Sequence, residues 1–203
     1  MSYYIFVMSI KIYLFDSNPF SVEFLSSLPF LSKEDIDSFK KYKVEEVKKE
    51  KIVSTYLKYK YVGHYEINRE GKPVSDSIFF NVSHSHGVVV LTLDTSPIGI
   101  DIEKIREVDE ELKHYISTDE EKSCIKDDKS FFEIWTSKES LVKCLGTGIN
   151  TKPNKILALP INGRKVYKDK MFISKCLQYD DLVISITRES DEDFDISIIK
   201  EVN

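Results

Sequence analysis

The chain has 203 residues, of which 41% are hydrophobic and 31% charged, a balance typical of a soluble globular protein that excludes an intrinsically disordered one. Its net charge of −5 argues against a general nucleic-acid binder, and no apolar stretch is long enough to span a bilayer. The 3 cysteines have no metal-like spacing, so we expect reduced thiols in a cytoplasmic protein.

The first predicted element is a strand over residues 10–15, inside the apolar opening MSYYIFVMSIKIYLF. This opening lacks a basic start and a small-residue cleavage site, so we expect a strand and not a secretion signal. The sequence leaves open whether translation starts at Met1 or Met8.

One or two helices are predicted over residues 33–61, where most apolar residues recur at helical spacing. Ser32 is a plausible N-cap, with Asp35 three residues later. The lysines of this segment alternate with glutamates, a pattern that favours a solvated helix face over a binding surface.

Three short β-rich runs follow a turn-rich loop at residues 68–76: SIFFNVS, GVVVLTL and PIGIDIEK. The strongest helical pattern then covers residues 127–148, with an apolar stripe and Gly146 as a natural stop. The tail, residues 171–200, predicts three more strands.

The strand pair at residues 86–95 is similar in pattern to the pair at residues 180–189. This similarity indicates two related halves joined near residues 96–99, although no repeat is visible at the level of identities.

Asp101 and Glu103 share one face of the strand predicted at GIDIEK, because side chains alternate along a strand. At a spacing of about 6.6 Å and an effective dielectric of about 20, their repulsion is on the order of 2–3 kcal/mol. Solvent on an edge strand, a Lys or Arg partner, or a divalent cation would each offset this cost.

Glu139 and Lys143 lie four residues apart on the strongest helix and therefore face the same way. Alone, this spacing is typical of an exposed ion pair. With Asp101 and Glu103, however, Glu139 gives three carboxylates, which could hold one Mg²⁺ and leave positions for waters and substrate phosphates.

His84 and His86 alternate in FNVSHSHG, a spacing that also suits zinc. No Cys or third His lies at a matching spacing, so zinc is not expected. A Ser-His nucleophile pair in the same segment has no better support.

Four segments in this order, GKP, FNVSHSHG, PIGIDIEK and FFEIWTSKESLVKCLGTGI, resemble the motifs of the surfactin-type 4′-phosphopantetheinyl transferases. These enzymes move the phosphopantetheine arm of coenzyme A onto a serine of a carrier protein. The resemblance implies an α+β fold in which two similar α/β halves are related by a pseudo-twofold axis, with coenzyme A in the cleft between them. Residues 1–97 would form the nucleotide end, and residues 98–203 would carry the metal site and the catalytic helix.

The resemblance also implies the residues of the metal end. Asp101, Glu103 and Glu139 would bind Mg²⁺, and Lys143 would touch the coenzyme A phosphates. Glu139 is the expected base for the serine hydroxyl, directly or through a metal-bound water, and the sequence does not decide between these routes.

At the nucleotide end, the resemblance implies that Lys72, Ser83 and His84 meet coenzyme A, mainly at its 3′-phosphate. Lys72 and His84 are then expected on the opposite side of the cleft from Lys143. The family usually has an Arg at or beside Glu50, and Lys51 is the substitute that we expect.

The expected function is Mg²⁺-dependent transfer of phosphopantetheine to an apo acyl or peptidyl carrier protein, with release of adenosine 3′,5′-bisphosphate. We expect a monomer that binds neither nucleic acid nor membrane. Two alternatives stay open: a Mg²⁺-dependent phosphohydrolase or nuclease that uses the same carboxylates, and a non-catalytic nucleotide- or carrier-binding module. The sequence does not identify the carrier protein.

Overall fold

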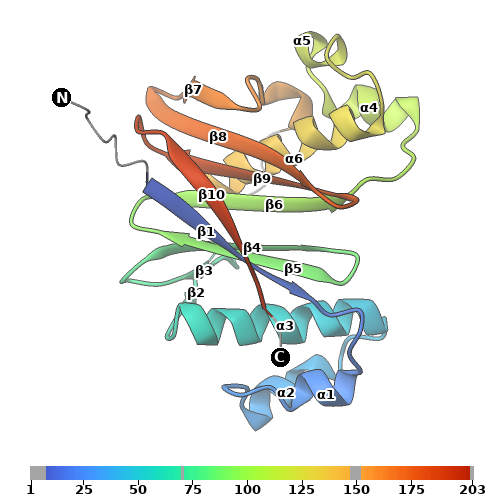
Figure 1. The fold of residues 1–203 in the computed structure, drawn as a ribbon, viewed down its shortest axis with the longest axis vertical. Coiled ribbons are helices and arrows are strands. Elements are labelled where there is room, and N and C mark those ends of the chain that lie inside the picture. The colour runs from blue at the N-terminus through green and yellow to red at the C-terminus, as the bar shows by residue number, and fades with distance from the viewer. Residues whose placement is uncertain (1–7, 70, 147–151, 202–203) are drawn as a thin grey trace, which may run out of the picture.

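The computed structural model describes residues 8–69, 71–146 and 152–201. The opening with Met1 and the end of the last motif, residues 147–149, lie outside this part of the chain. The described residues form two four-stranded sheets and a two-stranded ribbon, and helices cover the two outer faces (Figure 1). None of the helices in these ranges is both long and apolar enough to cross a bilayer.

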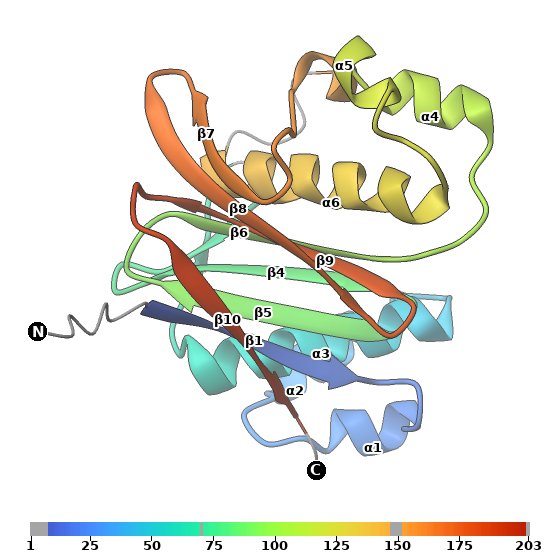
Figure 2. The ribbon, with the colours of Figure 1, turned by 45° about the horizontal axis from the view of Figure 1, so that its top comes forward.

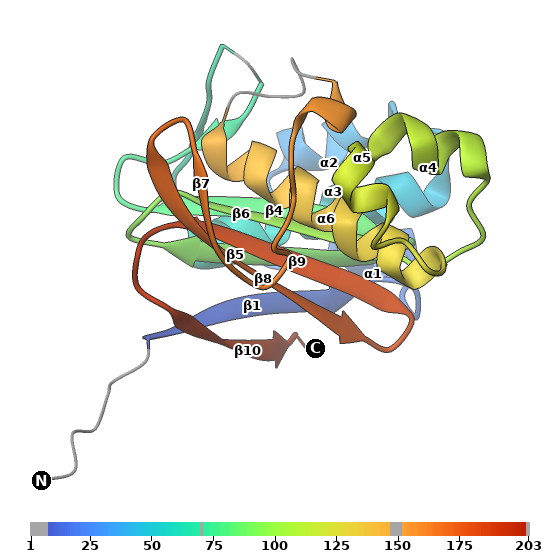
Figure 3. The same ribbon diagram turned by 90° about the horizontal axis from the view of Figure 1, so that it is seen from above.

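The first sheet has the strand order β10-β1-β5-β4. Its strands are β1 (Met8–Asp16), β4 (Phe79–Ser85), β5 (Val88–Asp94) and β10 (Phe194–Lys200). Strand β1 pairs antiparallel with β5 and parallel with β10, which runs beside it in Figure 3. Three helices lie on the outer side of this sheet: α1 (Val22–Ser26), α2 (Lys33–Phe39) and α3 (Glu45–Tyr61).

The second sheet has the order β6-β9-β8-β7 and is antiparallel throughout. Its strands are β6 (Ile98–Lys104), β7 (Gly163–Tyr167), β8 (Lys170–Tyr179) and β9 (Leu182–Glu189). The helices beside it are α4 (Glu110–Ile116), α5 (Asp119–Lys122) and α6 (Asp128–Leu145). The remaining elements are the ribbon strands β2 (Glu66–Ile67) and β3 (Pro73–Val74) and a 3₁₀ turn, η1 (Pro153–Lys155).

The main core lies between the inner faces of the two sheets. Apolar side chains of β1 and β5 meet those of β6 and β9 there, including Ile12, Val90, Ile100 and Ile184, all of which are fully buried. A second core joins α3 to the outer face of the first sheet. Because Ile100 and Ile102 point into the main core, the alternating residues of β6 point toward α6.

Gly99 of β6 allows α6 to lie directly on the strand, and Figure 2 shows the helix running along the second sheet. A Cβ built on Gly99 would lie 2.0 Å from the carbonyl oxygen of Ser140 and 2.4 Å from the amide nitrogen of Cys144. Hydroxyl contacts extend this close packing to β9, where the Oγ atoms of Ser140 and Thr187 lie 2.8 Å apart.

Most predicted elements are confirmed. The first strand, the helices at residues 33–61, the three central strands, the long helix and the three strands of the tail are present. Ser32 and Asp35 form a reciprocal capping box, and Gly146 ends α6 with a φ of 69°. Strand β7 and the β2–β3 ribbon were not predicted.

The α+β class is also confirmed, and the two halves share one connectivity. The first strand of each half pairs with the last strand, which pairs in turn with the middle one: β1-β5-β4 and β6-β9-β8. A long helix, α3 or α6, precedes the middle strand each time. Strand β10 comes from the C-terminal half but joins the first sheet.

We predict that Gly99→Ala lowers the free energy of unfolding by about 3 kcal/mol or more, because the new methyl group meets helix backbone, which cannot move aside. Urea denaturation measures the change. Gly63→Ala is the control: Gly63 has a φ of +78° but nothing within 4 Å of its Cβ position, so it should cost only about 1–2 kcal/mol. Equal losses in the two variants would contradict the close packing of α6 on β6.

Candidate active site

Asp101 lies where β4, β6 and α6 meet. Its carboxylate is 5% exposed, and its Oδ1 accepts hydrogen bonds from Oγ of Ser83 at 2.8 Å and from Nζ of Lys143 at 2.6 Å. Lys143 also donates to Oγ of Ser83 at 2.9 Å. Burial raises the pKa of Asp101, against the effect of the Lys143 ammonium. The contact therefore ties the edge of the first sheet to the second sheet and its helix.

Glu103 repeats this arrangement two residues further along β6. Its Oε2 accepts from Oγ of Ser85 at 3.0 Å and from Arg106 at 3.2 Å, and its Oε1 lies 3.4 Å from the indole nitrogen of Trp135. The alternating serines of β4 thus face the alternating carboxylates of β6. Sequence reasoning had placed Ser83 at the nucleotide end, whereas its hydroxyl contacts the carboxylate cluster.

Glu139 of α6 lies close enough to the same two carboxylates to be affected by their charges. Burial, followed by the Asp101 carboxylate, raises the pKa of Glu139 to about 6, and Glu103 acts in the same direction. Lys143 forms its ion pair with Asp101 and not with Glu139. The helix therefore does not carry the simple exposed pair that the spacing of Glu139 and Lys143 alone would suggest.

The carboxylate cluster of Asp101, Glu103 and Glu139 has the chemistry of a divalent-cation site. Oδ2 of Asp101 is buried and has no hydrogen-bond partner, and burial, followed by the charge of Asp101, raises the pKa of Glu139. Hard oxygen ligands of this kind suit Mg²⁺. Within the described ranges no three acidic, His or Cys side chains are already arranged around a common cation position.

Lys51 and His84 are brought together on the other side of β4. Nζ of Lys51 lies 3.2 Å from Nε2 of His84, and Nδ1 of His84 lies 2.9 Å from Oε2 of Glu50. The structure therefore places the lysine that was expected to replace the family arginine against the histidine of the SHS motif.

The side chain of Lys72 lies against the C-terminal end of α6. Its Nζ donates a hydrogen bond of 2.9 Å to the backbone carbonyl of Lys143, and burial lowers the pKa of Lys72. The expectation that Lys72 lies across the cleft from Lys143 is therefore wrong. The carbonyl groups at a helix C-terminus attract a cation, and this attraction holds Lys72 beside the helix.

A groove of about 320 Å³ adjoins Glu103. Its wall is largely apolar and comes from α4, α6 and the segment before α4, with contributions from Leu112, Tyr115 and Trp135. Leu112 and Tyr115 are 41% and 57% exposed, so this surface next to the carboxylate cluster is open to a partner.

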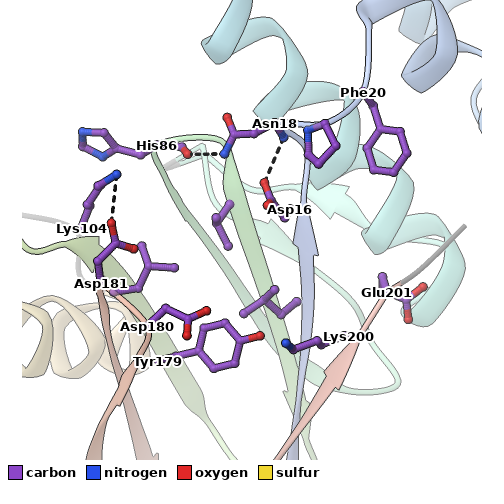
Figure 4. A pocket seen from close by; sticks show the side chains of 14 residues that line it. Asp16, Asn18, Phe20, His86, Lys104, Tyr179, Asp180, Asp181, Lys200 and Glu201 are labelled. Atoms are coloured by element: carbon purple, nitrogen blue, oxygen red, sulfur yellow. Dashed lines mark hydrogen bonds and ion pairs between the residues drawn. The ribbon is translucent and has the colours of Figure 1, made fainter.

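A separate cavity of about 440 Å³ opens at the far end of β1 (Figure 4). Two of its lysines have partners within the cavity: Nζ of Lys104 lies 3.0 Å from Oδ2 of Asp181, and Nζ of Lys200 lies 4.9 Å from the ring centroid of Tyr179. None of the predicted site residues lines it, and we assign it no part in the chemistry.

Sequence reasoning missed a buried ion pair beneath the site. Lys138, next to Glu139 in the chain, is 1% exposed, and its Nζ lies 2.5 Å from Oε2 of Glu121. It also donates to the carbonyls of Ile116 and Ile156 at 2.9 and 2.7 Å. The pair fastens α4, α5 and the segment after α6 to the helix that carries Glu139. The one sequence signal was the capping box formed by Thr118 and Glu121.

Comparison with known proteins shows which proteins this part of the chain is similar to. Residues 97–196 match the family model described as the 4′-phosphopantetheinyl transferase superfamily. This segment carries the carboxylate cluster, Lys143 and the buried ion pair. The segment is similar in sequence to that superfamily, which confirms the resemblance stated from the motifs.

Curated proteins with similar sequences are also 4′-phosphopantetheinyl transferases. The chain is 40% identical over 89 residues to 4′-phosphopantetheinyl transferase gsp of Aneurinibacillus migulanus, a match covering 40% of this chain and 38% of that protein. It is 36% identical over 95 residues to psf-1 of Bacillus pumilus, covering 42% and 41%, and 36% identical over 89 residues to Sfp of Bacillus subtilis, covering 39% and 40%. The chain therefore spans about two fifths of the length of the curated relatives it matches.

We predict that Lys138→Met lowers the free energy of unfolding by about 3–5 kcal/mol, because it leaves the buried Glu121 carboxylate without its cation. Lys129→Met on the same helix is the control, since Lys129 is 42% exposed and pairs with Glu133 four residues away; it should cost no more than about 0.5 kcal/mol. Chemical denaturation measures both changes. A loss for Lys138→Met as small as that of the control would show that the buried pair does not hold the helix in place.

Proposed function

We propose that the chain transfers the 4′-phosphopantetheine arm of coenzyme A to a serine of an apo acyl or peptidyl carrier protein and releases adenosine 3′,5′-bisphosphate. The observation that carries this proposal is that Lys143 pairs with Asp101, and that Asp101 and Glu103 lie near enough to Glu139 to add to the effect of burial on its pKa, within the segment that matches the transferase superfamily. Three carboxylates with an adjacent cation suit phosphoryl transfer, which needs positioning and charge neutralisation more than covalent help.

Asp101, Glu103 and Glu139 would hold Mg²⁺, with the unpartnered Oδ2 of Asp101 as one ligand atom. The ion would supply positive charge to the pyrophosphate oxygens of coenzyme A. Glu139 is the proposed base for the proton of the carrier serine, directly or through a metal-bound water.

Lys143 would bind a phosphate oxygen of coenzyme A. Its side chain is 27% exposed, and its Nζ lies 2.6 Å from Oδ1 of Asp101. A fixed cation at that position stabilises the negative charge that develops on the leaving phosphate.

The nucleotide would bind toward β4 and α3. Lys51 and His84 supply polar groups on that side, and Lys72 supplies a cation at the end of α6. We propose that the shared connectivity of the two halves reflects a pseudo-twofold axis, with residues 1–97 providing the nucleotide end and residues 98–203 the metal end.

The groove beside Glu103 is the proposed contact surface for the carrier protein. It adjoins the carboxylate cluster and exposes Leu112 and Tyr115, so a carrier bound there would present its serine next to the base. We propose a monomeric cytoplasmic enzyme, consistent with the three unpaired cysteines.

Release of adenosine 3′,5′-bisphosphate from coenzyme A, measured with and without an apo carrier protein, tests the proposal. The transferase requires both the acceptor and Mg²⁺. Release without any acceptor would identify a phosphohydrolase, and no release with a panel of acceptors would leave only a binding module.

The Glu139→Gln and Lys143→Ala variants separate the two proposed roles. We expect each to lose about 100-fold or more in transfer rate, because each removes a charged group that acts in the transition state. Only Glu139→Gln removes a metal ligand, so excess Mg²⁺ should recover part of its activity and none of that of Lys143→Ala. Initial rates across a Mg²⁺ titration measure the difference, and near-parent rates in both variants would refute these roles.

The raised pKa of Glu139 predicts how stability depends on pH in the metal-free protein. Between the ordinary value of 4.5 and about 6, the folded state holds a proton that the unfolded chain has lost. The wild type should therefore lose stability relative to Glu139→Gln as the pH rises through this window, with no further change above it.

Thermal unfolding of the two proteins in a chelator, across a pH series, measures this difference. Added Mg²⁺ at neutral pH should then stabilise the wild type more than Glu139→Gln. A stability difference that is independent of pH would contradict the shifted pKa.

A further inference from the structure

Two edge strands from different halves of the chain face each other at the candidate site. Strand β4 is an edge of the first sheet and β6 an edge of the second, and polar side chains bridge them. These are Asn81, Ser83 and Ser85, which alternate along β4 and are 9%, 7% and 7% exposed. They share one face of the strand, while Phe80 and Val82 on the other face pack with α3.

Two of these side chains bond to the backbone of β6. Oδ1 of Asn81 accepts a hydrogen bond of 3.0 Å from the amide nitrogen of Ile100. Oγ of Ser85 accepts one of 3.3 Å from the amide nitrogen of Lys104. A buried amide group without a partner costs free energy, so these contacts stabilise the junction and hold β4 in place along β6.

Ser85 also contacts Glu103, one of the proposed metal ligands. Its Oγ lies 3.0 Å from Oε2 of Glu103, and because an ionised carboxylate only accepts, the single hydroxyl proton of Ser85 points to Glu103. Nδ1 of His86, which lies 3.0 Å from the same Oγ, is then a donor in this arrangement. The hydroxyl of Ser85 is therefore held by its neighbours with its proton directed at the carboxylate.

The other donors to Glu103 restrict it less. Arg106 lies 3.2 Å from the same Oε2, but its long side chain is 47% exposed, and the indole nitrogen of Trp135 is 3.4 Å from Oε1. Ser85 has a short side chain, is buried and lies on a strand, so little freedom remains in its position. Its hydroxyl is thus the donor that best defines the orientation of the Glu103 carboxylate.

We propose that Ser85 is a positioning residue for the divalent cation, and that its hydroxyl fixes the Glu103 carboxylate in the orientation that binds the ion beside Asp101. Hydrogen-bond partners of metal ligands orient those ligands, and losing one typically costs about 10–100-fold in metal affinity. Because Ser85 and Glu103 belong to different halves of the chain, the affinity for the ion depends on the contact between β4 and β6. The inference rests on the proposed metal site.

Ser83 makes the matching contact with Asp101, but it also accepts a hydrogen bond from Lys143. Replacing Ser83 would therefore disturb the lysine that is proposed to bind phosphate. Ser85 is the residue that tests the inference without this second effect.

Mn²⁺ binding measured by electron paramagnetic resonance tests the inference without turnover. Mn²⁺ accepts the same oxygen ligands as Mg²⁺, and the signal of the free ion gives the bound fraction. The chain is titrated with Mn²⁺ at saturating coenzyme A and without a carrier protein. We expect Ser85→Ala to raise the Kd for Mn²⁺ about tenfold, and Ser85→Thr, which keeps the hydroxyl, to stay close to the wild type. The affinity for coenzyme A in a chelator should be the same in all three proteins.

Two controls separate positioning from packing. Ser174→Ala removes a fully buried hydroxyl of the second sheet, which lies 2.8 Å from Oγ1 of Thr187. Asn81→Ala removes a contact with the backbone of β6 and leaves the contact of Ser85 with Glu103 in place. Both should lower the unfolding temperature of the metal-free chain, as Ser85→Ala does, and leave the Kd for Mn²⁺ unchanged.

A Kd for Mn²⁺ in Ser85→Ala equal to that of the wild type would overturn the inference and leave the proposed metal site standing. A Kd raised equally in either control would also overturn it, because packing alone would then set the affinity. If the wild type binds coenzyme A but no Mn²⁺, the metal site fails, and the proposed function and the inference fail with it.

Discussion

The buried carboxylate of Asp101 is the interaction on which the candidate site depends. Its Oδ1 accepts hydrogen bonds from Ser83 of the first sheet and from Lys143 of α6. Its Oδ2 is buried and has no hydrogen-bond partner. Removing a carboxylate from water is expensive unless cations and donors compensate for it. The fold supplies donors to Oδ1 of Asp101 but none to Oδ2, and Glu103 and Glu139 add negative charge nearby. A bound cation would neutralise this excess of negative charge.

Local patterns predicted the elements and the faces of the residues that carry the chemistry. Alternation along β6 placed Asp101 and Glu103 together, and the turn spacing of α6 placed Glu139 and Lys143 together. The partners across elements had no such signature. Three contacts depend on how the sheets and helices pack, and residue spacing along the chain does not predict them. They are the contact of Ser83 with Asp101, the contact of Lys72 with α6, and the Lys138–Glu121 pair.

The proposed coenzyme site has an excess of negative charge at one end and an excess of positive charge at the other. At the metal end, burial, followed by the Asp101 carboxylate of β6, raises the pKa of Glu139. On α3, burial, followed by repulsion from Lys51, lowers the pKa of Lys58. A bound cation would compensate the first group and a bound phosphate the second, and β4 contributes Ser83 to the one side and His84 to the other. The packing of β4 against β6 therefore fixes the relation between the two ends.

Intact-protein mass spectrometry of apo carrier proteins after incubation with the chain, coenzyme A and Mg²⁺ tests the central claim most directly. The account predicts that at least one carrier gains the mass of a single phosphopantetheine. It also predicts no gain for a carrier whose acceptor serine is replaced by alanine. The Asp101→Asn variant of the chain should likewise produce no gain. No gain in any carrier of a panel of acyl and peptidyl carriers, while a known transferase modifies the same panel, would contradict the account.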